Sequence, residues 1–274
     1  MSTMRALSRI TTPSARAAGF LKRLPRCCAA GDDRRQFEST SKAQQQALVE
    51  LREYDLFPAQ SAEYMQTTAA ASQLIKKHSP LRIYSLPETG GQLHTATSFY
   101  YYAGGFDERN ATRSRMAQDT EFQQFLAESR PCVQAQRSML FVEAPLEGPT
   151  GLAQVPELQP GEDSILEIRR YKLKLGYDTV PKFLDLYGTG LPSKTTAQGT
   201  DPTTSLVTLL YSEVGRLNEV IEIWRHGDGT KAMERSRVAA RGAQEWRSAI
   251  ASITDLAIEF TSTIHKSAPF SPIK

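Results

Sequence analysis

Two segments far apart in the chain carry the same three ionisable side chains at the same spacing. Residues 165–173 read Ile-Leu-Glu-Ile-Arg-Arg-Tyr-Lys-Leu, and residues 49–56 read Val-Glu-Leu-Arg-Glu-Tyr-Asp-Leu. In both, a carboxylate, a guanidinium, a phenol and a leucine occupy every second position, which is the side-chain period of a β-strand. These side chains therefore share one strand face and predict a polar interior or a pocket. The corresponding pairs, 117 positions apart, are Glu50 and Glu167, Arg52 and Arg169, Tyr54 and Tyr171, and Leu56 and Leu173.

The guanidinium in each segment gives this face its chemistry. Arginine presents a planar fork of N–H donors that suits a carboxylate, and tryptophan supplies a flat apolar wall. If the first and third strands of each repeat are adjacent, Arg169 meets Glu222 in the sheet, and two interpretations stay open. We favour a structural ion pair with Glu167 or Glu222, because a buried arginine without a partner is costly. The alternative is a barrel pocket for an anionic or aromatic small molecule, lined by Arg52, Tyr54, Arg169, Tyr171, Glu222 and Trp224.

Residues for catalysis or metal binding are not grouped in the sequence. There is no Ser/His/Asp or Cys/His arrangement and no glycine-rich phosphate loop ahead of a helix. Cys132 stands far from Cys27 and Cys28, and the four histidines are scattered, so we expect no catalytic residues, no cofactor and no metal. The arginines of 235–241 are expected to form a solvated helix face.

Apolar periodicity, glycines and prolines predict the elements that position these residues, in the order β-α-β-β-α-β in each repeat. The first repeat has a strand at 47–56, a helix at 61–78, strands at 81–86 and 93–102, a helix at 110–130 and a strand at 133–143. The second has a strand at 165–175, a helix from Asp178 that is ended by Gly188, Gly190 and Pro192, strands at 203–213 and 217–225, helices at 230–241 and 245–253, and a strand at 255–264.

Smaller echoes support the duplication. Arg113-Ser114-Arg115 recurs as Arg235-Ser236-Arg237, and Glu121-Phe122 recurs as Glu245-Trp246. Because each predicted sheet has only one face covered by helices, its other face must be buried against the second repeat or another chain. The tail from Lys266, which contains two prolines, is expected on the surface. The predicted parts are a leader at 1–31, a polar tether at 32–46, the first repeat at 47–144, a Pro/Gly-rich linker at 145–163 and the second repeat at 164–274.

The leader is basic, whereas the rest of the chain is mildly acidic. Residues 1–31 contain six Lys or Arg residues and no Asp or Glu, a composition typical of a mitochondrial transit peptide, although a disordered basic tail is the alternative. The whole chain, with 33 basic and 30 acidic residues, is too balanced to indicate nucleic-acid binding. No segment reaches the roughly 20 apolar residues of a membrane helix. We therefore expect a protein that does not span a membrane, and leave open peripheral association with one.

Five stretches resemble the NIPSNAP family: the two Glu-Leu/Ile-Arg-x-Tyr-x-Leu strands, the turn and strand Glu213–Trp224, the segment Tyr102–Phe106 and the ending Lys266–Pro272. The resemblance runs from about Ala47 to the C-terminus. It implies an α+β fold of the dimeric α+β barrel type, in which two ferredoxin-like βαββαβ units place their sheets face to face. The family often has histidine where this chain has Glu222, and the matching position in the first repeat is Ser98. Chemistry attributed to that histidine is not expected here.

The resemblance also implies a function. Family members act in mitochondria as adaptor or structural proteins through protein–protein interaction, in mitophagy and quality control or in vesicle transport. Mitochondrial or autophagy-related proteins are therefore the expected partners, and a homo-oligomer stays open. The same fold hosts small monooxygenases and haem-degrading enzymes. The alternative is thus a small-molecule-binding protein or a monooxygenase-like enzyme.

Overall fold

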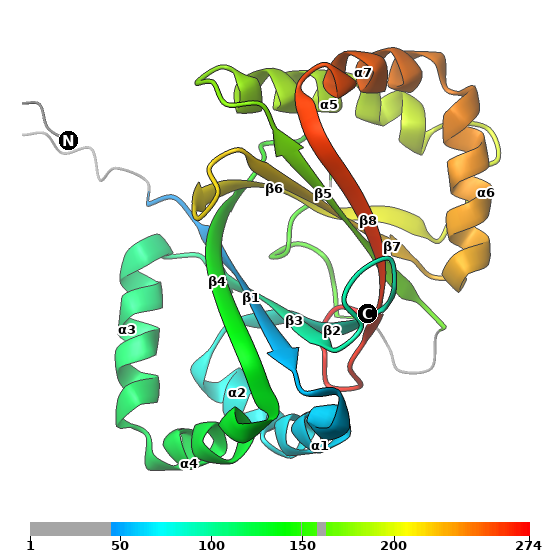
Figure 1. Ribbon diagram of the computed structural model, residues 1–274. Coiled ribbons are helices and arrows are strands. Elements are labelled where there is room, and N and C mark those ends of the chain that lie inside the picture. Colours follow the sequence, from blue (N-terminus) through cyan, green and yellow to red (C-terminus); the bar gives the residue numbers. More distant parts are fainter. Residues whose placement is uncertain (1–44, 149, 158–162) are drawn as a thin grey trace, which may run out of the picture. The chain divides into compact units, whose positions relative to one another are not determined.

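Eight β-strands pair edge to edge and close into an antiparallel barrel (Figure 1). The computed structural model describes residues 45–148, 150–157 and 163–274. The predicted leader at 1–31 lies outside the described residues. The strands are β1 (Leu48–Leu56), β2 (Leu81–Thr89), β3 (Thr95–Tyr102), β4 (Val133–Glu143), β5 (Ile165–Leu173), β6 (Thr204–Val214), β7 (Glu219–His226) and β8 (Ala257–Ser267).

The barrel is built from two halves that repeat one pattern. Its strand order is β1-β3-β2-β8-β5-β7-β6-β4, so each half contributes four neighbouring strands, and the pairs β2–β8 and β4–β6 join the halves. The register confirms the predicted correspondence of strand positions, because Arg52 lies opposite Ser98 and Arg169 lies opposite Glu222. The two halves thus join along their sheet edges.

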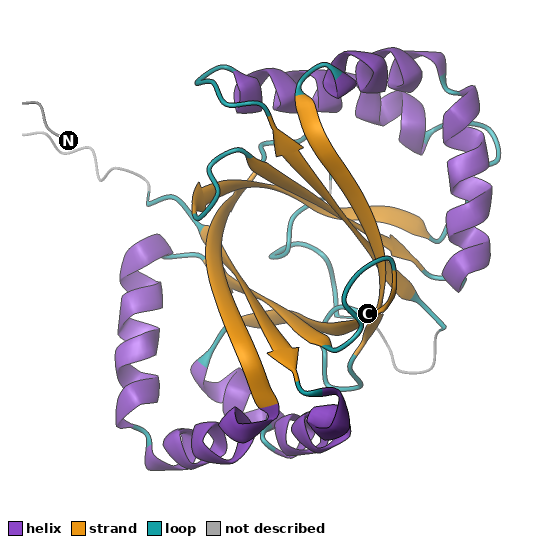
Figure 2. Cartoon of the chain, viewed as in Figure 1, coloured by secondary structure: helices purple, strands orange, loops and turns teal. Residues whose placement is uncertain are grey.

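In the described part of the chain, seven α-helices pack against the outer face of the barrel, in one group for each half (Figure 2). The first half carries α1 (Ser61–Ala70), α2 (Ser72–His78), α3 (Gly105–Gln118) and α4 (Thr120–Ser129), with short 3-10 turns at Pro58–Gln60 and Arg130–Cys132. The second carries α5 (Thr179–Thr195), α6 (Gly229–Gly242) and α7 (Gln244–Thr254). None of the helices in the described part of the chain is long and apolar enough to cross a membrane.

Three predictions about the helices are wrong. The single helices expected at 61–78 and 110–130 are each two helices, and the second break lies at Asp119, whose extended backbone lets its carboxylate cap α4 through Phe122 N at 2.8 Å. The glycines and proline expected to end α5 lie inside it. Gly190 serves close packing instead, because a Cβ atom there would lie 2.6 Å from the Cβ of Ala249 on α7.

Much of the barrel interior is apolar, and the Glu-Arg-Tyr set that was predicted to make it polar lies elsewhere. Further along the same inward faces of β1 and β5 the interior becomes charged, where Arg170 pairs with Glu53. Val49, Leu51, Leu166 and Ile168 point inward and pack in one buried cluster with aliphatic and aromatic side chains from the other strands. The glutamate, arginine and tyrosine side chains do share a strand face, as predicted. That face, however, points outward and is covered by the helices. The sequence could not decide between the two faces, because the alternation of side chains along a strand fits either choice of inner face.

Two chain segments outside the strands fill the barrel. Leu152 from the linker and Ile273 from the C-terminal tail are fully buried within the apolar interior, so the prediction of a surface tail is wrong. Arg82 ties both segments to β2. Its Nε and Nη2 donate to the carbonyls of Leu152 at 2.7 Å and Val155 at 2.6 Å, and its own carbonyl accepts from Ile273 N at 3.0 Å. Leu152 in the described part of the linker and Ile273 in the tail therefore belong to the core.

Candidate functional site

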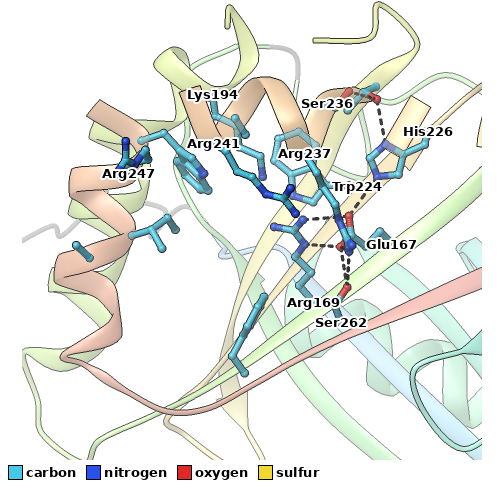
Figure 3. Close-up of a pocket in the computed structure, with 16 residues that line it drawn as sticks. Glu167, Arg169, Lys194, Trp224, His226, Ser236, Arg237, Arg241, Arg247 and Ser262 are labelled. Carbon is cyan, nitrogen blue, oxygen red and sulfur yellow. Dashed lines mark hydrogen bonds and ion pairs between the residues drawn. The ribbon is translucent and has the colours of Figure 1, made fainter. Parts of the chain in front are cut away.

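A cavity of about 650 Å³ lies in the second half, between the outer face of the sheet and the helices α5, α6 and α7 (Figure 3). The repeated strand face forms its floor, with Glu167 and Arg169 on β5 and Trp224 on β7. The helices supply its wall and its cations. Those basic side chains are Lys194, Arg237, Arg241 and Arg247.

Glu167 is the hub of the floor and is fully buried. Its carboxylate accepts hydrogen bonds from Arg169 Nε at 2.6 Å, Arg237 Nη2 at 2.5 Å, Ser262 Oγ at 2.7 Å and His226 Nε2 at 3.2 Å. Burial alone would raise the pKa of Glu167, but the bond from His226 and the charge of Arg169 hold it well below its usual range. Glu167 is therefore an anion whose acceptor positions are already occupied.

Glu222 lies behind the cavity and is equally saturated. It accepts from Arg169 Nη1 at 3.2 Å, Tyr171 OH at 2.9 Å, Trp224 Nε1 at 2.8 Å and the hydroxyl of Tyr187. Burial would raise its pKa, and the charges of Lys194 and Arg169 lower it on balance. Arg169 is thus the shared cation of two buried carboxylates, which is the pairing that the structural interpretation describes.

Lys194 is the unusual cation of the cavity. Only 8% of the residue is exposed, and its Nζ atom has no hydrogen-bond partner. The ammonium lies 3.6 Å from the ring centroid of Trp224 and 4.5 Å from that of Trp246, an arrangement of the cation–π type. Burial lowers the pKa of Lys194 from 10.5 to about 7, against the opposing charge of Glu222.

The remaining cations come from α6 and α7. Arg237 bonds Glu167 through Nη2, while its buried Nε has no partner, so the expectation of a solvated arginine face is wrong at this position. Neither Arg241 nor Arg247 forms an ion pair within the described ranges, and both line the cavity. The site therefore holds donors and positive charge that no side chain of the described chain satisfies.

The first half has a related cavity of about 550 Å³, lined by Arg52, Tyr54 and Arg113. Glu50 takes the place of Glu167 in this half. Its carboxylate accepts hydrogen bonds from Arg52 Nε at 2.9 Å and from Arg109 Nε and Nη2, each at 3.0 Å. Burial alone would raise the pKa of Glu50, but these arginines lower it to about 2. Of the six predicted pocket residues, Arg52 and Tyr54 line the cavity of the first half, and Arg169 and Trp224 line that of the second. Tyr171 and Glu222 line neither cavity, and the hydroxyl of Tyr171 donates to Glu222 behind the second one.

The two cavities differ in the side chains that stand at corresponding positions. Tyr100 and Phe122 replace the two tryptophans, and Ser98 stands in place of Glu222. No lysine lines the first cavity among the described residues. In neither half, as far as the chain is described, does a group of His, Cys, Asp and Glu side chains come together to hold a metal ion.

The sequence contained partial signals for the residues that were missed. The Glu245-Trp246 echo of Glu121-Phe122 pointed to Trp246. The Arg-Ser-Arg repeat matched Arg113 with Arg235, which is two positions too early. The helices α3 and α6 begin at Gly105 and Gly229, so Arg113 corresponds to Arg237. Lys194 had no signal, since the helix was expected to end before it.

Comparison with known proteins fits this architecture. An uncharacterized NIPSNAP domain protein from Burkholderia xenovorans is 25% identical and covers 36% of this chain and 95% of its own, with a TM-score of 0.34. A candidate monooxygenase from Fusobacterium nucleatum is 9% identical, covers 81% of this chain and 92% of its own, and has a TM-score of 0.59. An anthrone oxidase-like protein is 15% identical, covers 82% and 94%, and has a TM-score of 0.54.

At such identities the two larger structures share the fold with this chain, and a fold by itself does not fix a function. No curated protein matches the sequence. The family model described as NIPSNAP matches residues 49–146 and 166–272, one segment in each half of the barrel. The chain therefore belongs to the NIPSNAP family.

Proposed function

We propose that this NIPSNAP family protein binds a small organic anion with an apolar body in the cavity of its second half. The observation that carries the proposal is an imbalance of charge. Five basic side chains line the cavity, and the acidic side chains beside them, Glu167 and Glu222, already accept several hydrogen bonds each. An anionic ligand would satisfy the donors that remain.

The unsatisfied atoms indicate where the anion sits. Lys194 Nζ and Arg237 Nε are buried without partners, although buried donors in proteins are almost always paired. Trp224 and Trp246 offer flat apolar walls for the body of the ligand. The volume of about 650 Å³ lies within the roughly 300–1,000 Å³ of small-molecule sites.

Intrinsic fluorescence tests this proposal without a label. Trp224 and Trp246 are the two tryptophans of the chain, and both line the cavity, so a quenching titration reports on this site alone. We expect saturable quenching by aryl carboxylates and none by the corresponding aryl amides. The double variant Arg241→Gln/Arg247→Gln should lose at least tenfold in affinity, because each charged hydrogen bond contributes about 1.5–3 kcal/mol.

The matched control lies in the other half. Arg113 occupies the place of Arg237 in the first cavity, so Arg113→Gln should leave the titration unchanged. Unaltered quenching in the double variant, or equal quenching by acids and amides, would refute an anion site here.

A second function is favoured by a separate surface. We propose that the protein is also a mitochondrial adaptor, as in the family expectation, and that it docks partners in a groove of about 820 Å³ lined by Leu146, Leu175, Tyr177 and Leu217. Leu175 and Tyr177 are almost wholly exposed, which is uncommon for adjacent large apolar side chains. Asp185 is the charged residue among the described lining. The occupant is therefore an apolar segment of a mitochondrial or autophagy-related protein that carries a basic residue.

Crosslinking in intact mitochondria tests the adaptor proposal. A photoreactive residue at position 177 should capture peptides that combine apolar residues with a lysine or arginine, and Asp185→Asn should reduce their yield severalfold. The Lys194 cavity provides the control, because Lys194→Met should not alter the adducts. Capture of acidic peptides, or a yield that Asp185→Asn leaves intact, would contradict the proposal.

The finer description of the fold is likewise a proposal. We infer that each half is a ferredoxin-like unit, so that one chain holds both units of a dimeric α+β barrel. The strand orders β4-β1-β3-β2 and β8-β5-β7-β6, which are the same in the two halves, support this inference.

A further inference from the structure

The amine of Lys194 differs from an ordinary anion-binding group. It lines the cavity from α5, it is buried, and no acceptor on the described chain holds one of its protons. In a lysine that serves only to neutralise an anion, the protonated amine is stabilised by exposure to water and by carboxylate partners. Here two indole rings lie 3.6 and 4.5 Å from Nζ, and Glu222, the carboxylate whose charge acts most strongly on the amine, is saturated by other donors.

Burial favours the neutral form of the amine, which is the nucleophilic form, whereas the two indole rings favour the ammonium. Burial is the largest contribution and lowers the pKa to about 7, and the nearby cations Arg169 and Arg237 act in the same direction. Glu222 and Glu167 oppose them. At neutral pH a far larger fraction of Lys194 side chains would then be free amines than of exposed lysines, which have a pKa near 10.4 and are almost entirely protonated.

We propose that Lys194 forms an imine with a small oxo acid, which deepens and rests on the proposed anion-binding function. The ligand class follows from the groups around the amine. A carboxylate meets the arginines of α6 and α7, an apolar or aromatic body lies against Trp224 and Trp246, and a carbonyl carbon reaches Lys194 Nζ. A 2-oxo acid with an aryl side chain combines these three features.

The reaction is a condensation that needs no other reactant. The lone pair of Nζ forms a bond to the carbonyl carbon, and the oxygen takes up a proton to give a carbinolamine. The C–O bond then breaks, and the oxygen leaves as water with the two protons that the amine carried. Carbon and nitrogen end joined by a double bond, and nothing is oxidised or reduced.

The first half provides an internal comparison. Its cavity retains Arg52 and Arg113 beside Glu50 but has no lysine among its described lining residues, and it lacks both tryptophans. Anion binding alone would not require the two halves to differ in this way. The amine and the indole walls therefore occur together in the second half only, where the imine would form.

Reductive trapping tests the inference. Wild-type protein is incubated at pH 7 with phenylpyruvate and sodium cyanoborohydride, and the adduct is located by peptide mass spectrometry. We expect one lysine to gain the mass of the acid less one oxygen atom, and that lysine to be Lys194. Its modification should be roughly a hundredfold faster than that of Lys182, an exposed lysine on the same helix, because far more of Lys194 is unprotonated at this pH.

Two variants and one analogue complete the design. Lys194→Met and Lys194→Arg should both lose the adduct, and Lys182→Arg should keep it. The analogue 3-phenylpropanoate, which lacks the carbonyl, should quench the tryptophans without forming an adduct. The wild-type map does not depend on the folding of any variant.

The outcomes separate the imine from the binding site. If both acids quench the tryptophans and no adduct forms at Lys194, the imine is refuted and anion binding stands. If neither acid quenches, both proposals fail. Adducts spread evenly over the lysines would also refute a nucleophilic Lys194.

Discussion

Replacing Lys194 by methionine should stabilise the protein in mildly acidic solution. In the unfolded chain this lysine keeps its proton until about pH 10.5, whereas in the folded protein it releases the proton near pH 7. Between these values the unfolded state binds more protons, so the free energy of unfolding of the wild type rises with pH. Below pH 7 the folded state carries the full cost of a buried charge, which methionine removes.

The size of the effect follows from the shift in pKa. A change from 10.5 to about 7 corresponds to roughly 5 kcal/mol at about 1.4 kcal/mol per unit. Methionine forgoes the contacts of the ammonium with two indole rings, which are worth about 1–2 kcal/mol each. We therefore expect Lys194→Met to be more stable than the wild type by about 1–3 kcal/mol at pH 6, and this advantage to be lost as the pH rises towards 10.

Urea unfolding at pH 6, 8 and 9.5, followed by circular dichroism, measures this difference. Lys182→Met is the matched control, because Lys182 is exposed on the same helix and should show no pH-dependent change. A variant that is less stable than the wild type at pH 6, or one whose difference is equal at all three values, would refute the assignment of a buried cation with a lowered pKa.

Three further predictions follow from the fold and the leader. Arg169→Ala should lower the free energy of unfolding by roughly 3–5 kcal/mol, because Glu167 and Glu222 lose their shared cation, and Arg169→Met combined with Glu222→Gln should recover much of this loss in thermal melts; a single variant that melts like the wild type would contradict the ion-pair description. Gly190→Ala should destabilise the protein by about 1–3 kcal/mol, because its Cβ would meet Ala249, whereas Gly188→Ala, with its nearest neighbour at 3.6 Å, should not lose stability for steric reasons; equal denaturant midpoints for the two variants would argue against close packing of α5 on α7. Protein isolated from mitochondria should begin between about Cys27 and Thr40, as read by N-terminal mass spectrometry, and an intact Met1 or a cytosolic location on fractionation would exclude the leader as a cleaved transit peptide.

The register of the sheet was open to prediction because it depends on local alternation. Residues two apart on a strand must share a face, so the Glu-Arg-Tyr set follows from the sequence. The meeting of Arg169 with Glu222 follows once the first and third strands of a βαββαβ unit are taken as neighbours. Which face turns inward does not follow, because both faces are buried here. The helices cover the polar face, and Leu152 and Ile273 fill the apolar one.

The cavity escaped prediction for a related reason. Gly190 resembles a helix stop locally, and only the approach of α7, more than fifty residues later, makes it a spacer. Once α5 continues past Gly190, Lys194 is carried between Trp224 and Trp246. A lysine near a helix end is ordinarily solvated, so its burial could be found only from the tertiary contacts.

The position of Ile273 in the barrel bears on the order in which the chain folds. The strand β8 fills the gap between β2 and β5, and the last residues close over the interior, with the Lys274 carbonyl accepting from Arg225 Nε at 2.7 Å. The barrel cannot close before β8 has been synthesised, because this strand is the shared neighbour of β2 and β5. Until then β2 and β5 each keep an unpaired edge, and the apolar interior lacks Ile273. A substitution that disrupts β8 should therefore expose strand edges in both halves of the molecule, and not in the second half alone.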